Sequence, residues 1–295
     1  MEVVFLGTSA MVPTRQRNHP GVLLKYNGEY ILIDCGENIQ RQLRLAEISP
    51  MKITKLFITH WHGDHTLGIP GLMQALSVGD YSRELLIFGP RHSNLFMQRI
   101  TSAFLLEGKI RYRVKEARGL FFENDDYILE ALALQHTAPC LAFSFIEKDK
   151  RNIDIDYVRK FGLVKDPLLG ELQRGRDIVY KGKKIKVEDA TVIKKGKKIT
   201  YITDTLYTKN CLKAARNADL LICEATFGKD LEGKAMKYQH LTAEQSALLA
   251  MRANVKRLVL THFSQRYRST KLLEKEAKKI FQNTVCAKDF MRIIV

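Results

Sequence analysis

Three of the eight histidines in this 295-residue chain lie within six residues, together with an aspartate, in the segment LFITHWHGDHTLGIPGL. Imidazole nitrogen and carboxylate oxygen are the ligands that borderline divalent metals such as zinc take in proteins. We therefore interpret His60, His62, Asp64 and His65 as metal ligands. The alternative is a histidine-rich surface turn that binds no metal.

A short hydrophobic run, residues 55–59, precedes this cluster and carries β-branched and aromatic residues without a helical period. Such a run predicts a buried strand. His60 then stands where the strand ends, and the four candidate ligands are predicted to sit in a tight turn around Gly63. Side chains that splay from a turn can converge on an ion.

Three more candidate ligands end hydrophobic strand patterns, namely His136 in LEALALQH, Asp204 in ITYITD and His262 in KRLVLTH. A lone histidine at a strand end is more often a structural residue that is hydrogen-bonded to a neighbouring carbonyl. For each of these residues taken alone, a structural role without metal binding is the alternative. Taken together, the seven nitrogen and oxygen ligands exceed what one tetrahedral zinc needs. They suit two ions that share a bridging carboxylate.

The elements that must position these residues alternate between strand and helix patterns, which indicates an α/β fold. The predicted strands are 2–7, 21–26, 29–36, 55–59, 121–136, 140–148, 198–204, 218–226 and 256–262, with helices at 37–48 and 242–254. KLFITHWH and KRLVLTHFS repeat one arrangement, a strand that delivers Thr-His at its end. Two half-domains that face one another would explain the repeat.

The segment from about 147 to 196 departs from this patterning. From Glu147 to Ile199 the chain has sixteen Lys and Arg against nine Asp and Glu, with several glycines. We interpret it as an excursion from the core, with a solvated charged hairpin as the alternative. The formal net charge of +16 for the whole chain implies an anionic partner without saying which polyanion.

We expect a cytoplasmic protein. The sequence shows neither a signal peptide nor an apolar run long enough to span a bilayer, so no membrane association is expected. The five cysteines are odd in number and contain no C-x-x-C pair, which fits a reducing compartment better than a disulfide framework.

The motif H-x-H-x-D-H, followed by a later His, Asp and His, resembles the metallo-β-lactamase superfamily. The segments FLGTSAMVPTRQRN, IDCGENIQRQL, YITDT, CEATF and LTHFSQRY narrow the resemblance to the ribonuclease Z family. The resemblance implies a single domain over residues 1–295 with a four-layer αββα sandwich. It also implies that residues of about 147–196 form a protruding basic arm that binds tRNA.

By the same resemblance, two Zn²⁺ ions bind per chain, with Mn²⁺ or another divalent ion as the alternative. The implied ligands are His60, His62 and His136 for one ion, Asp64, His65 and His262 for the other, and Asp204 as the bridge. The implied activity is removal of the 3′ trailer from precursor tRNA, which leaves a tRNA 3′-hydroxyl and a trailer 5′-phosphate.

The resemblance assigns catalytic roles to Asp64, Glu224 and His240, with Glu224 orienting a protonated His240 that serves as the general acid. From the residues alone, a polar cap on a core strand is the favoured interpretation of Glu224, and a residue at a helix N-terminus that of His240; the resemblance reverses both. The chain departs from the family pattern at Cys223, where histidine is usual, and at Leu241, where serine is usual.

Two segments are expected to contact the substrate. By resemblance, the basic loop PTRQRN senses the tRNA 3′ end, and DPLLGELQRG grips the tRNA elbow from the arm of a homodimer; an ordinary solvated turn is the alternative for the loop. The substrate-binding residues expected are Pro13, Thr14, Arg15, Arg17, Asn18, Leu169, Gly170 and Arg174. The competing functions are a small-molecule phosphodiesterase or other hydrolase on the same metal core, and a non-catalytic RNA-binding relative.

Overall fold

The computed structural model describes residues 1–105 and 110–295 and divides the chain into two compact units. The first unit consists of Met1–Glu123, Leu129–Phe145 and Lys198–Val295, and the second of Asn124–Ile128 and Ile146–Lys197. All seven candidate metal ligands belong to the first unit. The fold below is therefore described mainly for that unit.

One sheet of the first unit is built from the N-terminal half and the last strand. In spatial order it contains β18 (Arg292–Ile294), β1 (Glu2–Gly7), β2 (Gly21–Tyr26), β3 (Glu29–Ile33), β4 (Lys55–Phe57), β5 (Glu84–Gly89) and β6 (Arg111–Glu116). The pairs from β18 to β3 are antiparallel and those from β3 to β6 are parallel.

The other sheet contains most of the C-terminal half. Its spatial order is β17 (Thr284–Cys286), β16 (Leu258–Thr261), β15 (Leu220–Glu224), β14 (Lys198–Ile202), β9 (Cys140–Glu147), β8 (Tyr127–Leu134) and β7 (Gly119–Glu123). Strands β14 to β17 run parallel in register. The predicted strand over 121–136 is therefore two strands, β7 and β8, separated by the turn at Asn124–Asp126.

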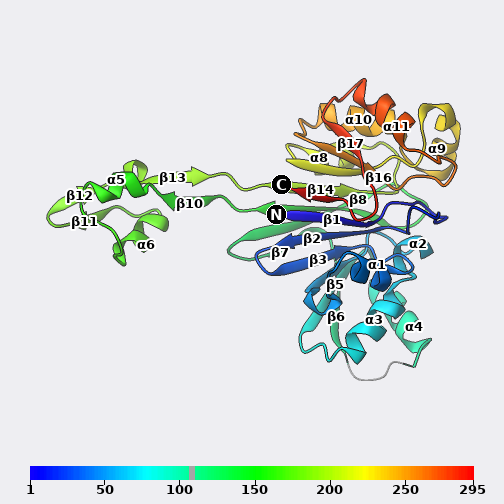
Figure 1. Ribbon diagram of the computed structural model, residues 1–295, viewed down its shortest axis with the longest axis horizontal. Helices are drawn as coiled ribbons and strands as arrows, with labels where there is room; N and C mark the ends of the chain where they lie inside the picture. The colour runs from blue at the N-terminus through cyan, green and yellow to red at the C-terminus, as the bar shows by residue number, and fades with distance from the viewer. Residues whose placement is uncertain (106–109) are drawn as a thin grey trace. The chain divides into compact units, whose positions relative to one another are not determined.

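Helices cover the outer faces of both sheets (Figure 1). Against the first sheet lie α1 (Ile39–Leu45), η1 (Pro50–Lys52), α3 (Ile69–Val78) and α4 (Ser93–Ser102); against the second lie α8 (Lys209–Ala215), α10 (Ala243–Arg252) and α11 (Lys271–Lys278). Two shorter elements, η2 (Lys229–Leu231) and α9 (Glu232–Tyr238), precede α10. Asn38 opens α1 at φ 69°, a left-handed conformation that Asn tolerates better than most residues.

The two sheets pack face to face through aromatic rings. Phe57 of β4 lies 4.9 Å from Phe143 of β9 and 5.6 Å from Phe121 of β7, measured between ring centroids. Tyr26 of β2 contacts Phe145 of β9 at 5.1 Å. With the helices outside, this gives four layers in the order α, β, β, α, which confirms the predicted fold class.

The second unit folds around a small core of its own. Its elements are β10 (Lys150–Ile153), α5 (Ile155–Arg159), α6 (Leu168–Gln173), β11 (Ile178–Tyr180), β12 (Lys183–Ile185), α7 (Val187–Ala190) and β13 (Thr191–Lys194). Val158, Leu163, Leu172 and Ile185 are buried together in it. A tRNA-binding role for this unit stays a prediction.

Within residues 1–105 and 110–295, no helix combines the length and the apolar character that crossing a bilayer requires. All five cysteines are buried and none is in a disulfide.

Candidate metal centre

Seven side chains with metal-binding chemistry meet where strands of the two sheets end. His60 follows β4, His136 follows β8, Asp204 follows β14, and His262 follows β16 directly. In a parallel sheet the carboxyl ends of neighbouring strands lie along one edge, so residues far apart in sequence become neighbours there. The four strand-end residues and the His60–His65 segment therefore share one place.

The segment from His60 to His65 is not a turn throughout, so that prediction is wrong for its second half. Gly63–Thr66 forms a single helical turn, α2, which begins after His62. Thr66 Oγ1 donates to the carbonyl of His62 at 2.9 Å and stabilises this turn. Asp64 and His65 are consequently presented from a helix, and His60 and His62 from the extended chain before it.

One group of ligands consists of His60, His62 and His136. The Nδ1 atom of His62 lies 3.0 Å from His60 Nε2 and 3.3 Å from His136 Nε2. Both Nε2 atoms lie 3.7 Å from Oδ2 of Asp204. Three ring nitrogens and one carboxylate oxygen thus point at a common centre.

The other group consists of Asp64, His65 and His262. The two Nε2 atoms lie 3.2 Å apart, and Asp64 Oδ2 lies 3.3 Å from His65 Nε2 and 3.4 Å from His262 Nε2. Asp204 faces this group with its other oxygen, Oδ1, at 3.4 Å from His65 Nε2 and 3.3 Å from His262 Nε2. Each oxygen of Asp204 therefore faces a different group.

Hydrogen bonds from the outer nitrogens fix how these rings are turned. His65 Nδ1 donates to Asp34 Oδ2 at 2.8 Å, and His262 Nδ1 to the Thr226 hydroxyl at 3.0 Å. The corresponding Nδ1 partners are the Thr59 hydroxyl for His60, at 3.1 Å, and the carbonyl of Gln239 for His136, at 3.1 Å. With Nδ1 protonated, each ring presents an unprotonated Nε2 to the centre, as a metal ligand must.

The electrostatics of the centre favour a cation. Burial alone would lower the pKa of His65, but the carboxylates of Asp64, Asp34 and Asp204 outweigh it and raise that pKa well above its usual value. Burial and the neighbouring His65 lower the pKa of His60 well below its usual value. The buried carboxylates thus create a negative potential that attracts a cation, and the neighbouring His60 imidazole stays neutral and can act as a ligand.

The donor set fits divalent metal ions. Nitrogen ligands at about 2.0–2.1 Å from a tetrahedral ion lie roughly 3.3 Å apart, close to the 3.0–3.3 Å between the ring nitrogens within each group. In addition, Oδ1 of Asp64 is buried and has no hydrogen-bond partner among the described residues. A buried carboxylate oxygen of this kind is costly unless a further ligand or ion satisfies it.

Glu224 and His240 lie beside the metal groups and are in contact. Glu224, the last residue of β15, is completely buried, and its Oε2 accepts from His240 Nδ1 at 3.1 Å. Thr205 N and Thr226 Oγ1 donate to Glu224 at 2.8 and 2.6 Å. Burial would lower the pKa of His240, but Glu224 and Asp204 outweigh it and raise that pKa to about 9.

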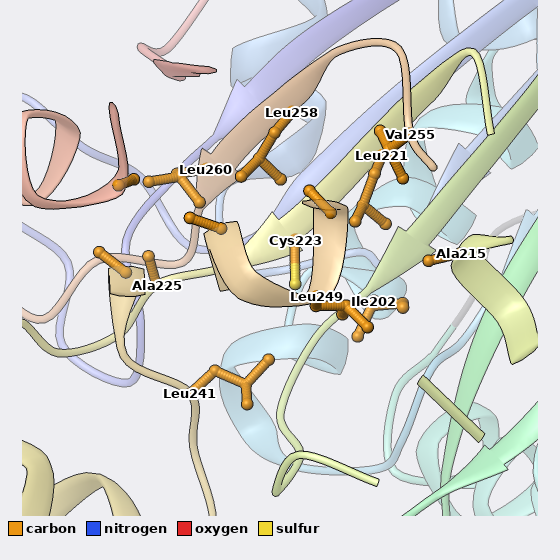
Figure 2. Packing of buried hydrophobic residues seen from close by; sticks show 14 of the residues in the cluster. Ile202, Ala215, Leu221, Cys223, Ala225, Leu241, Leu249, Val255, Leu258 and Leu260 are labelled. Atoms are coloured by element: carbon orange, nitrogen blue, oxygen red, sulfur yellow. The ribbon is translucent and has the colours of Figure 1, made fainter. Parts of the chain in front are cut away.

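The departures at Cys223 and Leu241 lie in the core behind the centre. Both side chains are completely buried and pack with Leu249 and Ala225 between the second sheet and its helices (Figure 2). Successive side chains of a strand point to opposite faces, so Glu224 faces the centre while Cys223 faces the helices. Cys223 Sγ contacts Ser246 Oγ there at 3.5 Å.

A pocket of about 370 Å³ opens over the centre, and part of its lining was not anticipated from the sequence. Lys237, Tyr238 and Arg266 line it together with His62, His136 and the other central residues. Arg266 lies in the segment LTHFSQRY, one of the segments that carry the family resemblance, so the sequence pointed to this region but not to Arg266 itself. Lys237 and Tyr238 end the exposed helix α9, and nothing in their spacing distinguishes them from surface residues.

The loop Pro13–Asn18 lies in the same unit as the centre, whereas the other expected substrate residues do not. The loop lines a separate hollow of about 350 Å³ with Arg41. Leu169, Gly170 and Arg174 belong to the second unit, on and after α6, where Arg174 pairs with Glu171. The contribution of all these residues to substrate binding stays a prediction.

Comparison with known families and proteins gives matches along the whole chain. The model for the anti-Pycsar protein Apyc1 matches residues 1–101, and the model for the beta-lactamase superfamily domain matches residues 189–263. Ribonuclease Z of Methanothermobacter thermautotrophicus is 39% identical over 297 residues, covering 100% of this chain and 97% of that protein. Ribonuclease Z of Thermococcus kodakarensis is also 39% identical, covering 96% and 90%.

A solved structure shows a similar fold over the full length. The crystal structure of human tRNase Z, short form, superposes with a TM-score of 0.73 at 30% identity and covers 100% of this chain and 99% of that one.

Proposed function

The chain belongs to the ribonuclease Z family, and on that premise we propose how its residues cleave precursor tRNA. It is a metal-dependent endoribonuclease that removes the 3′ trailer and leaves a 3′-hydroxyl on the tRNA and a 5′-phosphate on the trailer. The observation that carries the proposal is Asp204, whose two oxygens face two separate groups of ligands.

Two Zn²⁺ ions per chain suit this arrangement, one held by His60, His62 and His136 and the other by Asp64, His65 and His262, with Asp204 shared. Such ions, when bound, supply Lewis-acid polarisation of the phosphodiester and activate a water nucleophile near neutral pH. Asp64 keeps one buried oxygen without a hydrogen-bond partner, and we assign that oxygen to orienting the attacking water.

The leaving group requires a proton, because the P–O3′ bond breaks to release the 3′ oxygen of the tRNA. Glu224 accepts the Nδ1 proton of His240, which leaves the Nε2–H of the same ring available for donation. The carboxylate also favours the protonated imidazole, and Glu224 itself is held by Thr205 and Thr226. We assign His240 as the general acid and Glu224 as the residue that positions it.

Two basic residues of the pocket, Lys237 and Arg266, are suited to hold phosphates next to the cleaved bond. The basic second unit is proposed to grip the tRNA, with Leu169, Gly170 and Arg174 at the contact. We further propose a homodimer that works in the cytoplasm, where the five free cysteines stay reduced.

The experiment is incubation of the zinc-loaded protein with a precursor tRNA that carries a 3′ trailer, followed by mapping of the cut and its end groups. We expect one cut with a 3′-hydroxyl on the tRNA, loss of activity with a chelator, and recovery on adding Zn²⁺ or Mn²⁺. Hydrolysis of a nitrophenyl phosphodiester without any cut in the precursor would instead indicate the small-molecule phosphodiesterase. Light scattering tests the homodimer.

A further inference from the structure

A strongly basic groove is lined by residues that follow closely in sequence those of the pocket over the metal centre, and apart from Arg17 none of its lining residues has a role above. Its volume is about 830 Å³, and its lining runs from Arg268 to Lys288, with Gln16 and Arg17 on another side. The charged lining residues are seven lysines and arginines and one glutamate. We call it the α11 groove, because helix α11 supplies most of these charges.

Glu274 is the one acidic residue that lines the α11 groove, and both of its carboxylate oxygens have partners within the protein. Its Oε1 pairs with Lys278 Nζ at 2.6 Å, and its Oε2 accepts from the backbone N–H of Cys286 at 3.1 Å. It therefore offsets Lys278 and leaves the exposed Lys271, Lys275 and Lys279 uncompensated. The groove offers a concentrated positive potential.

The demands of the helix do not explain these charges. Lys271, Lys275 and Lys279 recur every four residues on one face of the helix, where like charges repel. The helix dipole favours lysines in the last turn but disfavours Lys271 in the first. Leu273 and Ala277 are buried and hold the helix against the core, so packing does not require a lysine at position 271.

A hydrogen bond from Arg17, which lines the α11 groove, to Ser264, which lines the pocket over the metal centre, links the two linings. The Arg17 side chain is only 8% exposed, and its Nη2 donates to the carbonyls of Ser264 at 3.3 Å and Tyr267 at 2.9 Å. Its buried Nε has no hydrogen-bond partner among the described residues. The lining of the catalytic pocket extends to Arg266, and that of the groove begins at Arg268.

We propose that the α11 groove binds the sugar–phosphate backbone of the single-stranded 3′ trailer downstream of the cut. The inference rests on the tRNA-processing function. A basic groove whose lining follows that of the pocket over the metal centre along the chain is suited to a strand that continues past the cut. The lining residues include no aromatic ring on which a base could stack, so the groove holds phosphates and accepts trailers of any sequence.

The hollow lined by the loop Pro13–Asn18 is a weaker candidate for the trailer. It is lined by Arg15, Arg41 and Arg17, but also by Glu37 and Asp289. Its charge is therefore less positive than that of the α11 groove.

The test compares two precursor tRNAs, one with a one-nucleotide trailer and one with a twelve-nucleotide trailer. The variant Lys271→Gln/Lys275→Gln/Lys279→Gln removes three exposed charges from the groove. The control Lys213→Gln/Arg216→Gln/Arg252→Gln removes three exposed charges from a separate hollow of about 490 Å³. Binding of both precursors is measured at several salt concentrations, and cleavage by single-turnover rates.

Each lost phosphate contact should lower the salt slope of binding by about 0.7, so the groove variant loses up to about 2 in slope for the long trailer. At 0.1 M salt this corresponds to up to about a hundredfold weaker binding. We expect the preference for the long trailer over the short one to disappear in the groove variant and to persist in the control.

Equal losses on both precursors would overturn the proposal and place the tRNA body in the groove. An unchanged salt slope in a variant with wild-type thermal stability would also overturn it, because the lysines would then contact no phosphate. A wild-type protein that cuts neither precursor would contradict the proposed function itself, which is a separate outcome.

Discussion

Asp34→Asn is expected to remove one metal ion and leave the other. Asp34 is completely buried, and its Oδ1 accepts from the backbone N–H of Thr59 at 2.8 Å while its Oδ2 accepts from His65 Nδ1 at 2.8 Å. An asparagine whose oxygen stays with Thr59 turns its NH₂ group towards His65. A donor then faces a donor, and His65 is driven to the tautomer that carries its proton on Nε2, the atom that must bind metal.

Loss of such an orienting partner typically costs about 10-fold to 100-fold in metal affinity, or roughly 1.4–2.7 kcal/mol. Only the group of Asp64, His65 and His262 should be affected, because His60, His62 and His136 do not contact Asp34 through a ring nitrogen. Asn also tolerates the left-handed backbone of position 34, where φ is 60°, so the exchange adds little strain.

The assay is equilibrium dialysis against buffered free Zn²⁺, with ions per chain counted by mass spectrometry. The wild type and the control Asp289→Asn, which changes a carboxylate away from the centre, should reach two ions at a free Zn²⁺ concentration where Asp34→Asn holds one. Retention of both ions with unchanged affinity would refute the orienting role. Equal weakening of both sites in a folded protein would refute the assignment of His65 to one group.

The remaining predictions concern the bridge, the acid, the second unit and one buried carboxylate. Asp204→Ala should weaken both metal sites together, in contrast to Asp34→Asn; elemental analysis showing one ion fully retained would contradict the bridge. His240→Ala should keep its metal but slow precursor tRNA cleavage by about 10²-fold to 10⁴-fold, and equal losses on an activated nitrophenyl phosphodiester would argue against leaving-group protonation. Residues 150–193 can be replaced by a short Gly-Ser linker because Lys150 pairs with Lys194 across β10 and β13, so the two cut ends lie close together. The replacement should nearly abolish precursor processing and flatten its salt dependence, while hydrolysis of a nitrophenyl phosphodiester persists in a variant that keeps its metal and its wild-type oligomeric state. Wild-type processing by this variant would show that the second unit does not bind the tRNA. Burial raises the pKa of Asp289 from 3.8 to about 6, so the folded state binds this proton more tightly than the unfolded state. The free energy of unfolding should therefore fall by up to about 3 kcal/mol as the pH rises from 4 to 6. Urea unfolding should show that this pH dependence is absent in Asp289→Asn, and the same pH dependence in both proteins would contradict the raised pKa of Asp289.

The sequence alone determined the strand ends that carry the metal chemistry. A run of β-branched and aromatic residues that stops at His60, Asp204 or His262 is a local signal, because burial in a sheet demands it and no distant residue is needed to recognise it. The repeated strand-Thr-His arrangement likewise predicted two facing halves, and the packing of Phe57 on Phe143 confirms them. The family motifs supplied the four-layer architecture.

Local patterns failed where the element was short or its neighbour was distant. The helical turn Gly63–Thr66 has too few residues for a helical period to be visible, so a turn was expected. Whether Cys223 faces the centre or the core depends on which side of β15 the helices cover, and that is set by packing rather than by the strand itself.

Only the tertiary structure decided which groups complete the site. Asp34 and Thr226, which follow β3 and β15, orient His65 and His262 across chain separations that no sequence pattern encodes. The α11 groove likewise combines a buried arginine from the N-terminal loop with lysines from the C-terminal helix. Ligand identity follows from side-chain chemistry, whereas tautomer, pKa and electrostatic potential follow from neighbours that the fold alone brings together.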